Sequence, residues 1–337
     1  MTTYQIKTRD NGRTIAPQRQ SKRKSSSRAP RTIALLGGDL RMLSLANMLA
    51  GAGHTVRQFA GPEGEDARNT AASLEDAIDG TDAVILPIPA SRDGDALNAP
   101  YYQGKDPRKI SLTEMLLPAL VALAPGAEIL CGMPSDPLRA AAENAGITLY
   151  DYGAEEAFVQ ENAALTAEGL IPMLEQRLGA PLDDATGIAV VAGYGRVGKA
   201  VADRLAFCGV KVTVLCRSAA AMQEVRDKGY APLSFEELYG KSGPQRLAGP
   251  RLLLNTIPAP VFDAASLRCF RGLYVELASV PGGRTDDAAE EMPPASFLPL
   301  PGIPGKVLPE KAGFAMGRAV LRRLAHLDFA GKEVSEC

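Results

Sequence analysis

Short apolar runs alternate along the chain with stretches in which apolar residues recur every three or four positions. The first run covers residues 31–36, and the stretch from Leu40 to Leu49 that follows it has helical spacing. A strand buried on both faces reads as a short continuous apolar run, and strands that alternate with helices form parallel sheets. The pattern therefore predicts a parallel α/β domain. Its further strands are expected at 55–59, 83–87, 128–132 and 148–150, with helices between them such as 111–123 and 137–144.

A second series of the same kind follows a long helical stretch at 155–178. In that stretch we expect Thr166 to cap the second part and Pro172 to kink the helix or lie in its first turns. A last segment, 309–327, has helical spacing and is expected to return to the first domain. The strands predicted between them cover 187–192, 210–216, 251–258, 272–279 and 297–305, with helical segments at 219–228 and 234–239.

The segment 187–198 has the features of a dinucleotide-binding turn. An apolar run leads into Gly193-x-Gly195-x-x-Gly198, an alanine-rich helical pattern follows, and a second apolar run arrives at 210–216. In such a turn the first glycine permits the tight bend, the second lets the backbone approach a pyrophosphate, and the third lets helix and strand pack closely. Glycines at this spacing also occur in ordinary turns, but the strand, helix and strand around them favour a cofactor site.

The residue after the second strand of that unit indicates which dinucleotide binds. NAD sites usually carry Asp or Glu there, because a carboxylate accepts hydrogen bonds from the ribose 2′-hydroxyl. This chain has Arg217-Ser218 instead, and guanidinium and hydroxyl groups bind phosphate oxygens where a carboxylate would repel them. A solvated arginine at a strand end is the alternative interpretation. We predict NADP(H).

These patterns together predict an α/β protein of two doubly wound parallel-sheet (Rossmann-like) domains joined by connecting helices. We expect residues 31–155 to form a substrate-binding and catalytic domain, and residues 156–305 to form the NADP-binding domain with its leading connecting helix. A C-terminal helix at 306–330 is expected to return to the first domain.

Charge is distributed unevenly along the chain. The net charge is −2, but residues 1–31 hold nine Lys or Arg against one acid, which leaves −10 on the remainder. The net negative charge of residues 32–337 argues against nucleic acid as the main partner. The basic segment combines low hydrophobicity with like charges, so residues 1–30 are predicted to be a disordered tail. An arm that binds nucleic acid or an acidic partner is the alternative.

The remaining composition excludes several classes of protein. The five cysteines are scattered and form no C-x-x-C pair. This pattern is typical of a protein in the reducing cytoplasm, and it predicts no metal site. No apolar run approaches the roughly 18 to 20 residues that a membrane span needs, so we expect no membrane association. His54 and His326 are expected to be packing or surface residues.

The loop after the first strand, Gly37-Gly-Asp39-x-Arg41, is a candidate ligand contact in the first domain. It lies at the carboxyl end of a strand, where doubly wound sheets bind their ligands, but it lacks the third glycine of a dinucleotide turn. Asp39 and Arg41 are therefore candidates to face a substrate. An Asp that caps the helix beside a solvated Arg fits the spacing equally well.

Six separated motifs occur in order between residues 31 and 328. They are Gly37-Gly38-Asp39-x-Arg41, Thr166-Ala-Glu-Gly169, Gly193-x-Gly195-Arg196-x-Gly198, Asn255-Thr-Ile-Pro258, Ala278-Ser-x-Pro-Gly-Gly283 and Pro301-Gly-x-Pro-Gly305. The ordered set resembles one family, the A subunit of dipicolinate synthase from spore-forming bacteria. The chain departs from that family at Glu276, where relatives have Asp, at Leu165, where they have Pro, and at Glu310, where they have Lys. Here a basic residue stands at Lys311 instead, so the roles of residues 276, 310 and 311 stay open.

The resemblance implies an NADP-dependent oxidation of a dihydrodipicolinate-type ring to pyridine-2,6-dicarboxylate during sporulation. It also implies a partner, the smaller flavoprotein-like B subunit, and a location in the cytoplasm of the mother cell; we further expect a homo-oligomer. The reaction moves a hydride to C4 of NADP⁺ and releases a proton. It needs positioning and cationic anchoring of two carboxylates more than it needs a strong base.

We expect this dicarboxylate substrate to lie between the two domains. Arg41 is predicted to hold one carboxylate through two parallel hydrogen bonds. Lys306 is the first candidate for the second carboxylate, and Lys311 is the next. Glu168 is a candidate to orient the ring nitrogen or take its proton, although a first-turn acid favoured by the helix dipole fits equally well. The catalytic candidates are Asp39, Arg41 and Glu168, and the predicted substrate-binding residues are Gly38, Asp39, Arg41, Thr166, Gly302, Gly305 and Lys306. The predicted cofactor-binding residues are Gly193, Tyr194, Gly195, Arg196, Val197, Gly198, Arg217, Ser218, Asn255, Thr256, Ile257, Pro258, Ala278 and Ser279.

Two other functions stay open on the sequence. A 2-hydroxy-acid dehydrogenase shares the two-domain layout, but it needs a histidine after a late strand of the cofactor domain, and neither histidine is placed there. A non-catalytic NADP(H)-binding subunit that regulates or scaffolds a partner fits the scarcity of acid/base groups.

Overall fold

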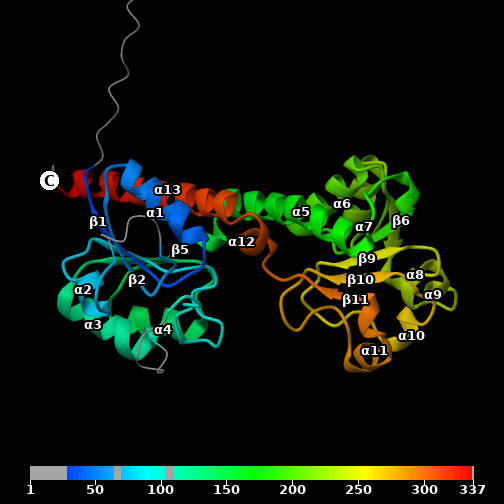
Figure 1. Cartoon of the computed structure of the whole chain (residues 1–337), viewed down its shortest axis with the longest axis horizontal. Helices are drawn as coiled ribbons and strands as arrows, with labels where there is room; N and C mark the ends of the chain where they lie inside the picture. The colour runs from blue at the N-terminus through cyan, green and yellow to red at the C-terminus, as the bar shows by residue number, and fades with distance from the viewer. Residues whose placement is uncertain (1–28, 64–69, 103–109, 336–337) are drawn as a thin grey trace, which may run out of the picture.

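The computed structural model describes residues 29–63, 70–102 and 110–335. For residues 327–335 it describes only the path of the backbone. Figure 1 shows two lobes, each built around one sheet, joined by the long helices α5 (Glu156–Leu178) and α13 (Pro309–Ser335). All strand pairings in both sheets are parallel, so the predicted class of two Rossmann-like α/β domains is confirmed. The basic tail predicted at 1–30 lies almost wholly outside the described residues.

The first sheet has five strands in the order β2-β1-β3-β4-β5. The chain runs from β1 outward to the edge strand β2, then returns to β3 on the other side of β1. The winding therefore reverses between β1 and β3. The strands are β1 (Thr32–Leu36), β2 (Thr55–Phe59), β3 (Ala83–Ile85), β4 (Glu128–Cys131) and β5 (Leu149–Asp151). The helices are α1 (Arg41–Gly51), α2 (Leu74–Ile78), the π-helix η2 (Leu112–Leu116) that continues into α3 (Leu117–Leu123), α4 (Asp136–Asn144) and the short η3 (Tyr152–Ala154).

The second sheet has six strands in the order β11-β10-β9-β6-β7-β8, and its winding reverses between β6 and β9. The strands are β6 (Ile188–Ala192), β7 (Lys211–Cys216), β8 (Ala231–Ser234), β9 (Leu252–Asn255), β10 (Leu273–Glu276) and β11 (Phe297–Pro299). The helices are α6 (Arg196–Phe207), α7 (Ala219–Asp227), α8 (Phe235–Tyr239), α9 (Gly243–Arg246), α10 (Ala264–Leu267) and α11 (Asp286–Glu291), with single turns η4 (Asp184–Thr186) and η5 (Pro294–Ser296).

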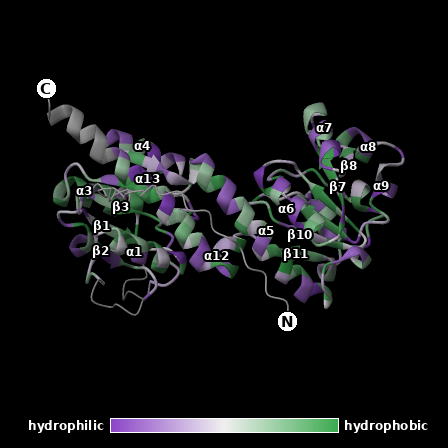
Figure 2. Ribbon diagram, turned by 90° about the horizontal axis from the view of Figure 1, so that it is seen from above, coloured by the Kyte–Doolittle hydropathy of each residue, from purple (hydrophilic) through white to green (hydrophobic). Residues whose placement is uncertain are grey.

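Each sheet is buried on both faces by its helices. In Figure 2 the hydrophobic colour follows the strands inside each lobe, and hydrophilic residues lie on the outward faces of the helices. The strands β1, β3, β4, β6, β9 and β10 are wholly or almost wholly buried, as the continuous apolar runs predict. The sheets therefore form rigid platforms, and ligand contacts fall to the loops at their carboxyl edges.

Helix α13 crosses back to the first lobe and packs along α1. A Cβ on Gly313 would overlap the carbonyl oxygen of Arg41, and one on Gly317 would overlap the Met48 side chain, so two glycines one turn apart let the helix axes approach closely. Buried residues of α13, including Met316 and Val320, share a hydrophobic cluster with β1 and α1. Although α5 and α13 are long, none of the helices among the described residues is both long and apolar enough to cross a membrane.

Arginines on the polar side of α13 pair with carboxylates of the first lobe and of α5. Arg318 pairs with Glu161 where both side chains are at least a third exposed, and Arg322 pairs with Glu155, whose side chain is 16% exposed. Arg323 differs, because its partner Glu128 is only 5% exposed at the start of β4, and its guanidinium also lies 4.7 Å from the centre of the Tyr150 ring. This last pair therefore joins the C-terminal helix to the interior of the first domain.

Two predictions of local structure are wrong, and one strand was missed. Helix α5 runs unbroken from Glu156 to Leu178, with Pro172 inside it, so Thr166 does not cap a second helix; its hydroxyl donates to the carbonyl of Asn162 instead. The edge strand β8 was missed because Pro232 and its short length mask the strand pattern. The apolar run at 297–305 is only a strand as far as Pro299, and the helix α12 (Ile303–Val307) follows.

Candidate active site

Both sheets present their candidate site loops where the winding reverses. In doubly wound sheets the ligand binds outside the carboxyl ends of the strands at this switch point. In the second sheet the loops after β6 and β9 contain Gly193–Gly198 and Thr256–Pro258. In the first sheet the loops after β1 and β3 contain Gly37–Asp39 and the segment 86–92. The topology thus brings the two glycine motifs, far apart in sequence, to equivalent places in the two domains.

The turn after β6 has the geometry that a dinucleotide site requires. Gly193 adopts φ +94°, and a Cβ there would lie 2.5 Å from the Thr256 hydroxyl. A Cβ on Gly198 would overlap the carbonyl oxygen of Gly193, so this glycine lets α6 start directly against the turn. Gly195 is different: its φ is −81° and nothing lies within 4 Å of its Cβ position. Its lack of a side chain leaves open space above the loop, where the backbone is accessible to a ligand.

Helix α6 begins at this turn without a side-chain cap. Gly195 is the N-cap residue, and its carbonyl accepts the Lys199 N–H in the first turn of the helix. The N–H groups that precede Lys199 are therefore available to an anion at the positive end of the helix dipole. A hollow of about 440 Å³ lies over the turn, lined by Glu156, Gln160, Ala163, Tyr194, Gly195, Arg196 and Lys199.

Charged side chains around this hollow are already paired. Arg196 reaches across to Glu156 in the first turn of α5, and this hydrogen bond lowers the pKa of that exposed carboxyl. Lys199 pairs with Glu224 at 2.7 Å, and its Nζ lies 5.1 Å from the centre of the Tyr194 ring. Among the described residues, the backbone N–H groups of the turn, rather than an unpaired cation, are thus the groups open to an anion here.

Arg217 and Ser218 follow β7 at the same edge, and both are exposed. The Ser218 hydroxyl accepts a hydrogen bond from the Ala221 N–H at 3.1 Å, so it caps α7. The Arg217 guanidinium lies 5.6 Å from the centre of the Phe235 ring, and no carboxylate pairs with it in the described part of the chain. The guanidinium is therefore held beside the strand end with its donors available.

Asn255 lies at the predicted nicotinamide edge, but its side chain is fully buried. Its Nδ2 donates to the Ile257 carbonyl at 2.9 Å and to Glu276 Oε1 at 2.7 Å, while its Oδ1 accepts from the Ile257 N–H. A side chain with all these partners and no exposed surface cannot touch a cofactor. The structure therefore corrects its predicted role: Asn255 shapes the loop that carries Thr256 and Pro258.

Glu276 organises the facing loop, a role that the sequence left open. Its carboxylate, 9% exposed, accepts hydrogen bonds from Asn255 and from the N–H groups of Ala278 at 3.1 Å and Gly283 at 2.8 Å. The Tyr274 hydroxyl lies 3.4 Å away, and burial together with this carboxylate raises the pKa of Tyr274 well above its usual value. The signal in the sequence is an acid that ends an apolar strand just before a Pro-Gly-Gly turn. This network leaves Ala278 half-buried and Ser279 exposed beside the turn after β9.

In the first domain Asp39 and Arg41 form a closed pair. Arg41 Nε donates to Asp39 Oδ1 at 2.7 Å and Nη2 donates to Oδ2 at 2.9 Å; Nη2 also donates to the Ile88 carbonyl at 2.6 Å. A Cβ on Gly305 would lie about 3.0 Å from both side chains, so α12 packs directly over the pair. Asp39 Oδ1 also accepts the backbone N–H of Arg41, the first residue of α1, at 3.2 Å, so Asp39 contacts the start of the helix as a capping Asp would. The Arg41 side chain is only 11% exposed, so a solvated Arg is not observed. The guanidinium fork predicted to hold a substrate carboxylate is occupied by Asp39, which contradicts that geometry.

The remaining predicted substrate residues do not all gather at this edge. Glu168 on α5 pairs with Lys311 on α13 at 2.5 Å, and both side chains are partly exposed. The Thr166 hydroxyl donates to the Asn162 carbonyl of the same helix. Gly302 has φ +70° and starts α12, on which Lys306 is exposed with no carboxylate partner among the described residues. Gly38, by contrast, lies in the loop itself, and its N–H donates to the Asn98 carbonyl at 2.7 Å.

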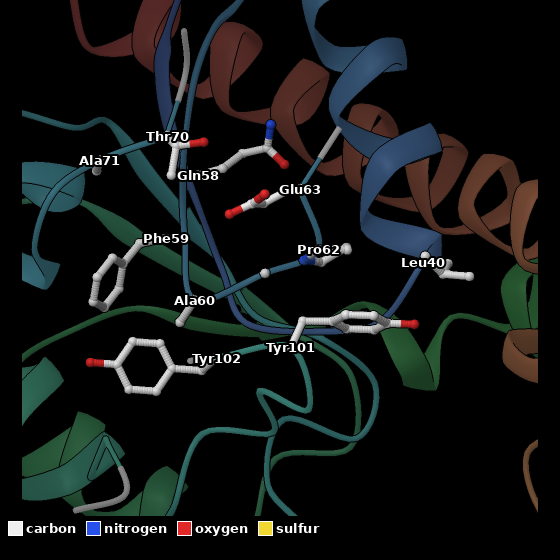
Figure 3. Close-up of a pocket in the computed structure, with 11 residues that line it drawn as sticks. Leu40, Gln58, Phe59, Ala60, Pro62, Glu63, Thr70, Ala71, Tyr101 and Tyr102 are labelled. Atoms are coloured by element: carbon white, nitrogen blue, oxygen red, sulfur yellow. The ribbon is translucent and has the colours of Figure 1, made fainter. Parts of the chain in front are cut away.

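A separate hollow of about 490 Å³ lies beyond the end of β2. Figure 3 shows Tyr101 lying between Ala60 and Leu40, with the Glu63 carboxylate above it. Its described lining includes aromatic, amide and carboxylate groups but neither Lys nor Arg. It therefore offers no positive charge to a dicarboxylate, although it adjoins the start of α1.

Comparison with known proteins relates these features to one family. Residues 32–153 match the family model described as the N-terminal domain of the A subunit of dipicolinate synthase. The A subunit of dipicolinate synthase from Bacillus subtilis (strain 168) is 29% identical over 168 residues, which are 49% of this chain and 54% of that protein. The resemblance to this family is confirmed. The aligned part spans only about half the length of this curated relative.

Solved structures of dipicolinate synthase A subunits have a similar fold. The crystal structure of the Bacillus halodurans A subunit of dipicolinate synthase has a TM-score of 0.73 at 23% identity and covers 88% of this chain and 98% of that one. The apo-structure of D-lactate dehydrogenase from Escherichia coli has a TM-score of 0.57 at 13% identity and covers 89% of this chain and 97% of that one. At these identities the structures show the fold alone, which is a dehydrogenase-like arrangement of two α/β domains.

Proposed function

We propose that this protein is an NADP-dependent oxidoreductase that converts dihydrodipicolinate to dipicolinate, pyridine-2,6-dicarboxylate. The observation that carries the proposal is the Gly193–Gly198 turn, built for a dinucleotide, in a chain whose first domain matches the family model for the A subunit of dipicolinate synthase. When bound, the nicotinamide takes the hydride from a ring carbon; a proton leaves the ring, and aromaticity favours the product. The chain itself has to hold the dicarboxylate and accept that proton.

The turn after β6 binds the pyrophosphate through N–H groups at the start of α6. Gly195 keeps the backbone accessible, and Thr256 and Ser279 stand at the nicotinamide end of the same edge. Asp39, Arg41 and Glu168 stay candidates for catalysis. Because Arg41 is closed onto Asp39, the pair acts as a neutral unit that fixes the β1 loop, and Glu168, which pairs with Lys311, is the candidate proton acceptor.

Turnover by the purified chain tests this function. We expect dihydrodipicolinate and NADP⁺ to yield ultraviolet absorbance of the pyridine product, with equal amounts of NADPH, when the partner B subunit is present. Binding of NADP(H) without turnover under any condition would instead favour a regulatory or scaffold role. A 2-hydroxy-acid dehydrogenase is disfavoured by the position of His54 before β2, at the amino edge of the first sheet, opposite to the ligand edge.

Cofactor choice has its own test. Arg217→Asp should weaken NADP(H) binding by about tenfold or more, since it replaces charge-assisted hydrogen bonds to the 2′-phosphate with repulsion. NAD(H) affinity should stay level or rise. Calorimetric titration of both cofactors measures this, with Arg226→Asp on exposed α7 as the control of equal charge change. Tighter NAD(H) than NADP(H) binding by the unaltered chain would refute the NADP(H) assignment.

The cellular setting that we propose rests on the resemblance. The chain would act with a flavoprotein-like B subunit, in the form of a homo-oligomer, in the cytoplasm of the mother cell of a sporulating bacterium. Size-exclusion chromatography of the two subunits, separately and mixed, tests the assembly directly.

A further inference from the structure

The ligand edge of the first sheet needs a cation that Arg41 does not supply. Two of the Arg41 nitrogens are taken by Asp39 and the Ile88 carbonyl, and the pair carries no net charge. A second carboxylate brought to this pair would meet Asp39 as well as Arg41. Anchoring a substrate carboxylate at the β1 and β3 loops therefore requires another guanidinium or ammonium group.

Arg92 lies in the loop after β3 and fills this requirement. Its Nε donates to Asn98 Oδ1 at 3.1 Å, and the side chain is exposed. No carboxylate pairs with it in the part of the chain that the structure describes. With Nε held by a neutral amide, both terminal nitrogens stay free to donate to one carboxylate.

Asn98 ties Arg92 to the glycine loop of β1. The backbone carbonyl of Asn98 accepts the Gly38 N–H at 2.7 Å, and the side-chain Nδ2 of Asn98 donates to the Pro89 carbonyl at 3.0 Å. A Cβ on Gly37 would lie 2.8 Å from the same Asn98 carbonyl, so the two loops are in direct contact. Asn98 is 8% exposed. One buried amide thus fixes Arg92 at the switch point of the sheet, next to the predicted substrate loop.

The segment that carries Arg92 is itself braced. Asp93 Oδ1 accepts from the Ser91 hydroxyl at 3.0 Å and from the Ala96 N–H at 2.8 Å, and Ser91 bridges to Leu97 as an antiparallel pair. A short closed turn of this kind loses little freedom when a ligand binds. The guanidinium is therefore preorganised rather than carried on a loose loop.

We propose that Arg92 binds one carboxylate of the dicarboxylate substrate at the β1/β3 switch point, and that Asn98 is its positioning residue. This inference deepens the proposed function and rests on it for the identity of the substrate. The second carboxylate then lies on the side of α12, where exposed Lys306 has no carboxylate partner among the described residues.

Binding of two related acids tests Arg92 without relying on turnover. Calorimetry of the full chain with saturating NADP⁺ compares pyridine-2,6-dicarboxylate with pyridine-2-carboxylate, which lacks one carboxylate. We expect the unaltered chain to bind the dicarboxylate about tenfold more tightly or better, and Arg92→Gln to abolish that advantage. Arg92→Lys should keep part of it. Arg57→Gln is the control, because Arg57 is a guanidinium of the same domain that is held by the carbonyls of Asp76 and Asp79.

A double-mutant cycle tests the role of Asn98. Asn98→Ala should weaken binding of the dicarboxylate when Arg92 is present. In the Arg92→Gln background it should have no further effect on that binding, because Asn98 acts through Arg92. Independent losses would mean that Asn98 is merely structural.

The outcomes separate this inference from the proposed function. Binding of the dicarboxylate through Arg92 without oxidation of dihydrodipicolinate would support the subsite and refute the reaction. Normal dicarboxylate affinity in Arg92→Gln, an equal loss in Arg57→Gln, or no binding of either acid by the unaltered chain would overturn the subsite, whatever the turnover assay gives.

Discussion

Replacing Arg323 with Ala should lower the free energy of unfolding of the first domain by about 3 kcal/mol or more. The guanidinium is the partner of Glu128, which is 5% exposed at the start of β4 and receives both Arg323 Nε and Nη2. Without it, a carboxylate stays buried with no opposite charge, and the Tyr150 ring loses the cation that covers it. The loss also removes the ion pair that joins α13 to the start of β4.

Urea denaturation followed by circular dichroism measures this effect, with Arg318→Ala as the matched control on the same helix. Arg318 pairs with Glu161 where both side chains are at least a third exposed, so its loss should cost at most about 1 kcal/mol. Equal effects of the two substitutions would show that burial of Glu128 does not matter. Glu128→Gln/Arg323→Ala should recover part of the loss, because a neutral amide costs less to bury than a carboxylate.

Gly198→Ala should reduce dinucleotide affinity by about a hundredfold or more and also destabilise the second domain. The added methyl group overlaps the Gly193 carbonyl and comes within 3.2 Å of the Thr256 hydroxyl, so α6 has to move away from β6 and the phosphate turn opens. The N–H groups at the start of α6 then no longer converge on the pyrophosphate.

Gly195→Ala is the informative companion to this variant. Its φ of −81° suits alanine, and its Cβ position is open, so the free protein should be as stable as the unaltered chain. Cofactor affinity should still fall, because the methyl group occupies the space above the loop. Calorimetric titration with NADPH and thermal unfolding without ligand separate the two effects. If Gly195→Ala bound NADPH normally, the pyrophosphate would not lie over this loop.

Local patterns were sufficient for much of the fold. Apolar runs of strand length, alternating with helical spacing, placed the strands of both sheets except the short edge strand β8, in which Pro232 interrupts the pattern. The glycine turn was predicted for the reason that the structure shows, since a φ of +94° and a helix start against a carbonyl both depend on the absence of a Cβ. Thr166 failed as a cap because packing of α5 between the domains overrides a local capping signal.

Side-chain roles at the site depended on partners far away in the sequence. Arg41 has the guanidinium group that could bind a substrate carboxylate, yet its Nε and Nη2 donate to Asp39 and to the Ile88 carbonyl instead. Asn255 stands in a cofactor motif but is turned inward to Glu276, 21 positions later. Arg92 lies in no recognisable motif, and only the strand order and the contact of Asn98 with Gly38 place it at the ligand edge.

The sequence by itself therefore determined the two parallel sheets, the glycine turn after β6 and the family resemblance, because these depend on backbone conformation and on short-range periodicity. The tertiary structure alone decided which charged groups are free. A guanidinium or amide has several donors that any nearby acceptor can occupy, and which acceptors are near is set by the order of the strands rather than by spacing along the chain.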